Sequence, residues 1–250
     1  MNNKEQENKK KGILWILLWC LTFTLSMTAA KFLHKNVSSA SLFSMRYIIG
    51  GLFFLPLFFR NIKEIPIRVK DFYTLRLHIL RAVCMGGASY FTYLAYRNVP
   101  IAIATSIGFT VPLIISAIGI IFLKEQLRKQ KIVALSLGYL GVLLILRPHD
   151  LDFNIYMLYG LLSAFLASIV IISTRILSRY DSAMVLMMFI SIFLGGSALI
   201  IAFIYGISCS LKDGLLLCLI AMLGTFSQYA YIKAVSYAEA SFVAPYSERD

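Results

Sequence analysis

The chain has 250 residues, of which 59% are hydrophobic and only 14% are charged. Its mean hydropathy is +0.78, whereas a soluble domain averages about 45–50% apolar and about 25% charged residues. One globular core cannot bury this much apolar surface, so we expect lipid to surround the chain. The net charge of +12 does not indicate nucleic-acid binding, because the basic residues lie between apolar runs and form no continuous stripe.

Eight apolar segments are long enough to be membrane helices, since a bilayer core of about 30 Å needs about 20 apolar residues. They are Gly12–Leu33, Ser39–Phe59, Leu77–Tyr96, Val99–Leu123, Ile132–Leu146, Ile155–Leu177, Ser182–Gly206 and Gly214–Ala234. The fifth is short and would stand nearly upright or beside a thinned bilayer. A ninth segment begins near Ala238.

The first segment ends in "SMTAAK", which resembles a signal-peptide cleavage site. Its apolar stretch is longer than the usual region of about 7–15 residues, and further spans follow, so we interpret it as an uncleaved anchor. Residues 1–11 then form a cytoplasmic tail. With the N-terminus inside, alternation places sixteen Lys and Arg residues on the cytoplasmic side and five outside, when Arg46, Arg81 and Arg249 are left out. This asymmetry predicts that orientation.

The two halves of the chain are similar to each other. When the sequence is shifted by 136 positions, Ser89 aligns with Thr225, Thr92 with Gln228 and Tyr93 with Tyr229. A shift of 144–145 positions also aligns Gly50-Gly51 with Gly195-Gly196. We therefore expect a repeat at 12–148 with five spans and a second at 155–250 with three spans and the start of a fourth. A unit of five spans inverts its second copy, and inverted repeats are typical of transporters with a midplane site and alternating access. A channel or an enzyme can also be duplicated.

Several stretches resemble a known family: "WCLTFTLSMTAAKFL", "SLFSMRYIIGGLFFLP", "YLAYRNVPIAIATSIGFTVPLI" and "FLKEQLRKQKIVALSLGYLGVLLILRP". They are similar to EamA-type transporters of the drug/metabolite transporter superfamily. The resemblance implies an all-α bundle of ten helices in two inverted five-helix repeats, in the bacterial inner membrane and compatible with a homodimer. The stretch "YIKAVSYAEASFVAPY" resembles the subgroup that takes up S-adenosylmethionine in obligate intracellular bacteria.

One face of the first predicted helix is a candidate wall for this substrate. Trp15, Trp19, Thr22 and Ser26 follow one another at helical spacing. Two indoles could attract an adenine ring and a sulfonium cation. The alternative is ordinary packing of small residues and an interfacial tryptophan belt.

The remaining candidates are polar residues inside apolar segments. Arg46 could pair with a substrate carboxylate or could snorkel to the interface. Arg81 lies near the end of its span, so we interpret it as a snorkelling anchor. Pro112 interrupts the fourth span and marks a helix break. The polar positions matched between the two repeats are candidate midplane contacts or helix–helix hydrogen bonds; these are Ser89, Thr92, Tyr93, Thr225, Gln228 and Tyr229.

No other chemistry is indicated. The cysteines Cys20, Cys84, Cys209 and Cys218 lack CxxC spacing, and His34, His78 and His149 are dispersed, which predicts neither a disulfide framework nor a metal site nor a cofactor. No HExxH motif or paired carboxylates suggest an enzyme.

We therefore expect a secondary carrier of a small polar metabolite, with S-adenosylmethionine uptake as the leading hypothesis and other amino-acid-like or nucleotide-like substrates open. The chain ends "SFVAPYSERD", and by comparison with the first repeat about 33 residues would complete the second. A truncated, inactive remnant is the alternative.

Overall fold

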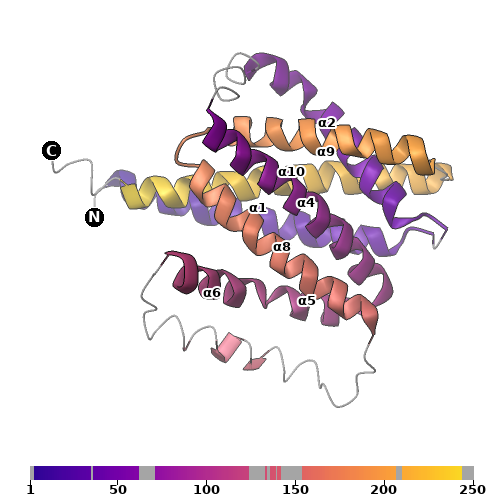
Figure 1. Ribbon diagram of the computed structural model, residues 1–250, viewed down its shortest axis with the longest axis horizontal. Helices are drawn as coiled ribbons and strands as arrows, with labels where there is room; N and C mark the ends of the chain where they lie inside the picture. The colour runs from indigo at the N-terminus through magenta and orange to yellow at the C-terminus, as the bar shows by residue number, and fades with distance from the viewer. Residues whose placement is uncertain are drawn as a thin grey trace. The chain divides into compact units, whose positions relative to one another are not determined.

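The computed structural model describes residues 3–34, 36–61, 71–123, 133, 136–138, 140–141, 154–206 and 210–243. Within these residues the regular structure is α-helical (Figure 1). The helices are α1 (Asn3–Lys31), α2 (Ser39–Asn61), α4 (Phe72–Asn98), α5 (Ile101–Gly108), α6 (Val111–Leu123), α8 (Ile155–Leu177), α9 (Ala183–Tyr205) and α10 (Leu211–Val243). The predicted span Ile132–Leu146 lies largely outside the described residues, as do Cys209, His149 and the last seven residues.

Six helical stretches of the described chain are long and apolar enough to cross a membrane. They lie in α1, α2, α5 together with α6, α8, α9 and α10. The chain is therefore an all-helical, multi-pass membrane protein. The predicted span Leu77–Tyr96 lies within α4, which is not among the six. Within this stretch α4 carries His78 and Arg81, whose polar side chains lower its mean hydropathy.

Polar residues cap the start of several helices, where the backbone N–H groups of the first turn lack helical partners. The Ser182 hydroxyl accepts a hydrogen bond from Val185 N at 3.3 Å at the start of α9. At the start of α10, Ser210 Oγ accepts from Asp213 N at 3.2 Å and donates to its carboxylate at 2.7 Å. Asp213 also accepts from His34 N at 3.1 Å, which ties the α1–α2 connection to α10. Such caps fix the helix starts and are worth about 1 kcal/mol each.

The fourth predicted span is divided into two helices. α5 ends at Gly108, residues Phe109 and Thr110 form a turn, and α6 begins at Val111. Pro112 is the second residue of α6. A proline has no N–H to donate and is tolerated in the first turn of a helix, which explains why the new helix begins just before it.

The predicted boundary between an eighth and a ninth span is wrong, because α10 is one continuous helix of 33 residues. In the first half of the chain, the corresponding boundary is at Pro100, which caps α5 with φ −53° and ψ 141°. The shift of 136 positions places Ser236 opposite Pro100. Ser236 keeps its backbone N–H, and its hydroxyl donates to Ile232 O at 2.9 Å. Nothing at this position therefore interrupts the helix.

The chain divides into two compact units that do not follow the predicted repeats. Unit 1 comprises residues 1–83 and 173–250, and unit 2 comprises residues 84–172. In unit 1, α10 packs along α1 and also contacts α2 and α9, and α2 packs against α9 (Figure 1). One core cluster of unit 1 contains Phe54, Leu177, Leu186, Met187 and Ile232. The repeat boundaries at 12–148 and 155–250 stay a prediction.

In unit 2, small residues let its helices approach each other closely. Gly160 of α8 faces Ile107 of α5, where an added Cβ would lie 3.2 Å from the Ile107 side chain. Ser163 of α8 donates to Ala88 O at 2.9 Å. Close approach at small residues, with hydroxyl groups bonded across the contact, is typical of helices packed in lipid.

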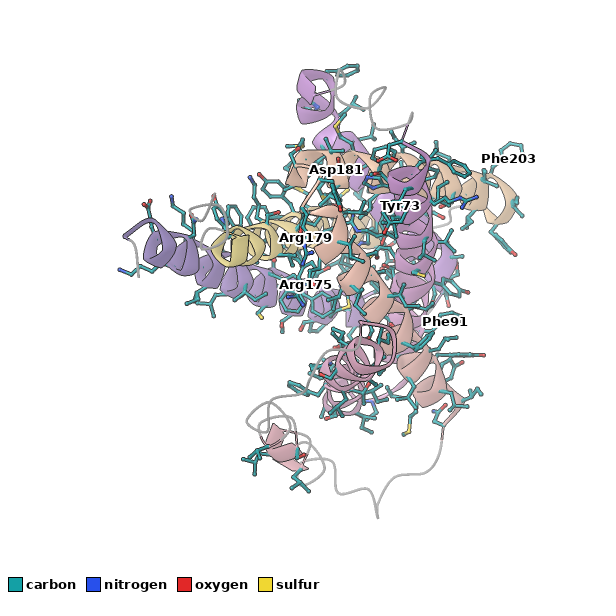
Figure 2. The ribbon with its side chains drawn as sticks, turned by 60° about the vertical axis from the view of Figure 1, so that its left-hand side comes forward. Tyr73, Phe91, Arg175, Arg179, Asp181 and Phe203 are labelled. Atoms are coloured by element: carbon teal, nitrogen blue, oxygen red, sulfur yellow. The ribbon has the colours of Figure 1, made fainter. Side chains whose placement is uncertain are left out.

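Large apolar side chains cover the outer surfaces of the helices. Phe203 near the end of α9 is 92% exposed and points away from the helix (Figure 2). Leu17 of α1, Leu199 of α9 and Leu215 of α10 are also well exposed. A soluble monomer rarely shows so much apolar surface, and these side chains suit contact with lipid.

Candidate functional site

A small recess lined by both apolar and polar residues lies inside unit 1. Its volume is about 20 Å³, and its walls come from three helices. The lining residues are Arg46, Tyr47, Gly50 and Gly51 of α2, Met187, Ile190 and Ser191 of α9, and Thr225 and Gln228 of α10. Three residues selected from the sequence, Arg46, Thr225 and Gln228, are therefore brought together. Arg46 lies 179 positions before Thr225 and 182 positions before Gln228, so only the fold could join them.

Arg46 is the charged group of the recess. The residue is 7% exposed, so its side chain does not snorkel to the surface. Its Nη2 donates to Gly224 O at 3.2 Å, and its Cζ lies 5.3 Å from the centroid of the Tyr47 ring. A backbone carbonyl and an aromatic face both stabilise a cation. The guanidinium is thus held in place at the recess, where it can act as an anion-binding group.

Two glycines make room for these side chains. A Cβ on Gly224 would lie 2.6 Å from Arg46 Nη1 and 2.8 Å from Cζ, so only glycine leaves space for the guanidinium. A Cβ on Gly50 would overlap Thr225 Oγ1. That hydroxyl donates to Ala221 O at 2.7 Å, within α10. By contrast, a Cβ on Gly51 would meet no atom within 4 Å, because Gly51 borders the open space of the recess.

The face of α1 selected from the sequence packs against α10. The Trp15 ring meets Tyr229 edge-on at 5.7 Å, and the Trp19 ring lies 5.4 Å from Tyr231. Ser26 is fully buried and donates to Ile220 O at 3.2 Å. Thr22 donates to Leu18 O of its own helix at 2.7 Å. None of these four α1 residues lines the recess, so their role as substrate contacts stays a prediction.

The candidates on α4 belong to unit 2. Thr92 Oγ1 and Ser163 Oγ lie 2.6 Å apart and share a hydrogen bond. Tyr93 is 1% exposed, and Ser89 is half-buried. Tyr229, the residue that corresponds to Tyr93, lies in unit 1 and packs against Phe54 at 5.8 Å.

A second buried polar group in unit 1 was not predicted from the sequence. The snorkelling prediction for Arg81 is wrong, because its side chain is fully buried. Arg81 Nε donates to Thr174 Oγ1 at 2.8 Å, and Nη1 donates to Leu186 O at 3.3 Å. One turn away, His78 Nε2 lies 2.9 Å from Asp181 Oδ2. The signal in the sequence was the spacing of Thr74, His78 and Arg81, which places three polar residues on one face of α4.

The described part of the chain contains no cluster of His, Cys, Asp and Glu that could hold a metal ion. Cys20, Cys84 and Cys218 are free thiols. The polar groups of the recess are one guanidinium, hydroxyls and an amide. Such groups can hold a polar group by hydrogen bonds and charge.

Known proteins resemble this chain along nearly its whole length. S-adenosylmethionine uptake transporters of Rickettsia prowazekii and Rickettsia bellii are 26% and 28% identical over 236 residues, which is 94% of this chain and 79% of each relative. A riboflavin transporter of Vibrio cholerae is 26% identical over 243 residues, which is 94% of this chain and 80% of that protein. One crystal structure of a protein matches with a TM-score of 0.60 at 17% identity, over 93% of this chain and 84% of the other.

The family model of the EamA-like transporters matches residues 10–147. This range includes α1, α2, α4, α5 and α6 apart from the first residues of α1, and therefore more than half of the chain. Together with the transporter relatives, it identifies a membrane transporter and not an enzyme. The chain belongs to the EamA-like transporter family.

Proposed function

We propose that this protein is a secondary carrier that takes up S-adenosylmethionine across the bacterial inner membrane. Relatives from two Rickettsia species that bear this name align with 94% of the chain. We also propose that the N-terminus is cytoplasmic. Sixteen Lys and Arg residues on that side against five on the other support this orientation.

The observation that carries the proposal is the position of Arg46 at the recess of unit 1. An ionisable residue inside a membrane helix is rare and marks a functional site. S-adenosylmethionine has a carboxylate at its amino-acid end, and a guanidinium binds a carboxylate through two parallel hydrogen bonds. Arg46 already has a carbonyl partner and an aromatic neighbour, so its guanidinium is preorganised to bind that carboxylate.

We assign the amino-acid end of the substrate to this recess. Pockets that enclose a whole drug-sized ligand have volumes of about 300–1,000 Å³. The recess of about 20 Å³ is far smaller, so in this proposal it widens during the transport cycle to admit the amino-acid end. Ser191, Thr225 and Gln228 supply uncharged hydrogen-bonding groups near Arg46. These groups suit the substrate ammonium, which needs acceptors without a second strong positive charge.

The transport cycle that we propose is alternating access between two inverted five-helix repeats of a ten-helix bundle. The matched polar positions of the two halves, Ser89 with Thr225 and Thr92 with Gln228, support the duplication. A substrate site near the midplane is the usual location in such carriers. Thr225 and Gln228 line the recess, which agrees with that arrangement.

Riboflavin is the second candidate substrate, because relatives from Vibrio cholerae and Brucella anthropi are named riboflavin transporters. Riboflavin has a flat ring system and an uncharged polyol chain but no carboxylate. Arg46 would then lack the anionic partner that its burial favours. The charge at the recess therefore favours S-adenosylmethionine.

The test is uptake of labelled S-adenosylmethionine by proteoliposomes that contain the 250-residue chain. Saturable uptake that unlabelled S-adenosylmethionine inhibits, and that riboflavin does not, would support the proposal. Saturable riboflavin uptake without S-adenosylmethionine uptake would support the second candidate. Uptake of neither compound by correctly folded protein would contradict the carrier function.

A further inference from the structure

A buried cluster of charged groups lies in unit 1 and contacts Leu186 and Phe189 of α9. We call His78, Arg81, Thr174 and Asp181 the His78–Asp181 cluster. His78 is 1% exposed, Arg81 and Thr174 are each 0% exposed, and Asp181 is 6% exposed. Asp181 lies in the turn after α8, beyond Arg175 and Arg179 (Figure 2). Buried charges in a membrane protein are unfavourable unless they pair, and they often mark pathways for ions or protons.

His78 is the group of this cluster with an unpartnered ring nitrogen. Its Nε2 is 2.9 Å from Asp181 Oδ2, which fits a neutral imidazole that donates from Nε2 to the carboxylate. Its ring stacks on the Phe189 ring with the centroids 3.9 Å apart and the planes inclined by 13°. Nδ1 is buried and has no hydrogen-bond partner among the described residues. The Nδ1 lone pair can therefore accept one proton, and no other bond has to break.

The neighbours of His78 come from α4, from the turn before α9 and from α9 itself. Arg81 lies on the same helix, Asp181 lies in the turn before α9, and Phe189 of α9 is uncharged. Arg81 interacts electrostatically with Asp181 and with Tyr231 of α10, and Tyr231 interacts with Arg175 near the end of α8. Since the charge of Arg81 balances that of Asp181, the cluster is neutral when His78 is neutral. One proton on Nδ1 adds one uncompensated positive charge to a buried site.

The first turns of α9 connect this cluster with the recess. The Leu186 carbonyl accepts from Arg81, and Phe189 stacks on His78. Met187 and Ile190, the residues that follow these two, line the recess. A change of charge that shifts Leu186 or Phe189 can therefore also move the recess wall, because all four residues lie close together in one helix.

We propose that the His78–Asp181 cluster is a proton-binding site and that the proton is cotransported with the substrate. This proposal rests on the uptake function proposed above. The proton comes from water on the outer side, binds His78 Nδ1 and leaves to water on the inner side, so no redox partner is needed. The direction follows from uptake, since the proton gradient across a bacterial inner membrane is directed inward.

The first experiment detects the proton site without any substrate. The His34→Gln/His149→Gln variant keeps His78 as the single histidine, and ¹⁵N NMR follows its two ring nitrogens from about pH 8 to about pH 5, the range in which histidine usually changes charge. We expect Nδ1 to be unprotonated at the upper end and protonated at the lower end. An imidazole that stays in one form over this range would overturn the proton site.

The second experiment measures coupling in proteoliposomes with the membrane potential clamped at zero. With one proton per substrate, an inward gradient of one pH unit should drive about tenfold accumulation of labelled S-adenosylmethionine. His78→Gln and Asp181→Asn should lose the accumulation while they retain exchange of labelled for unlabelled substrate. His34→Gln, which changes an exposed histidine, is the matched control and should accumulate like the unmodified chain.

The two proposals fail in different ways. If S-adenosylmethionine is exchanged normally but the pH gradient produces no accumulation, the proposed proton coupling is refuted and the proposed substrate is retained. If both cluster variants still accumulate tenfold, the proton binds elsewhere, and the assignment to His78 is overturned. If no S-adenosylmethionine is exchanged but Nδ1 titrates, the substrate proposal falls, and the proton-binding site is supported by the NMR result.

Discussion

Replacement of Arg46 by glutamine tests the proposed carboxylate site most directly. Glutamine keeps an N–H₂ donor near Gly224 O but removes the positive charge and the bidentate fork. Hydrogen bonds to charged groups are worth about 1.5–3 kcal/mol, and about 1.4 kcal/mol corresponds to a tenfold change in affinity. We therefore expect Arg46→Gln to weaken S-adenosylmethionine binding by about 10- to 150-fold.

The assay pairs this substitution with a change in the ligand. Decarboxylated S-adenosylmethionine lacks only the carboxylate. Its affinity, measured by competition against labelled substrate, should therefore be nearly the same in the Arg46→Gln variant and in the unmodified chain. Arg76→Gln is the matched control, because Arg76 is exposed and its guanidinium lies 3.9 Å over the Phe72 ring. Equal weakening of both ligands by Arg46→Gln, or the same loss with Arg76→Gln, would refute the assignment of the carboxylate to Arg46.

Three further substitutions test the packing. Gly224→Ala should raise the KM for uptake, because the new Cβ displaces the Arg46 guanidinium. The control Gly196→Ala, whose new Cβ meets no atom within 4 Å, should leave the KM unchanged. The same KM in both variants would contradict the close approach of Gly224 and Arg46. Ser26→Ala removes the hydrogen bond to Ile220 O and should lower the free energy of unfolding in detergent by about 0.6 kcal/mol, the average for such bonds; a more stable variant would argue against that bond. Ser236→Pro should destabilise α10 by about 3 kcal/mol, since proline removes a helical hydrogen bond; thermal unfolding measures the loss, and an unchanged midpoint would show that α10 is already broken there.

Much of the helical structure could be predicted from the sequence, because each apolar run is bounded by polar residues. The predicted spans Ser39–Phe59, Ile155–Leu177 and Ser182–Gly206 agree closely with α2, α8 and α9. Ser182 is the N-cap and Gly206, with φ 67°, follows the last turn of α9. The end of the eighth span was placed wrongly because an apolar run of about 20 residues was interpreted as a complete span, whereas α10 continues to Val243. In the first half of the chain, Pro100 creates the corresponding boundary, because a proline has no N–H to donate to a helical hydrogen bond.

The candidate site was harder to predict, because a helical pattern identifies a face but not its neighbour. Arg46, Thr225 and Gln228 were selected as polar residues within apolar segments, and they line one recess. The Trp15–Ser26 face has equally regular spacing, yet it packs against α10. Arg81 was placed at the surface by its position near a span end. Its burial depends on Thr174 and Leu186, which lie more than 90 positions away.

The length of α10 has a geometric consequence for the protein in the bilayer. Its 33 residues measure about 50 Å at 1.5 Å per residue. Even at a tilt of about 40°, the upper end of the usual range, the helix extends about 38 Å along the membrane normal, which exceeds a hydrocarbon core of about 30 Å. Gly12 of α1 lies beside Tyr237 near the end of α10, so the lysine-rich beginning of α1 lies near this end of α10. At least one end of α10 must therefore stand clear of the hydrocarbon, in the headgroup layer or in water.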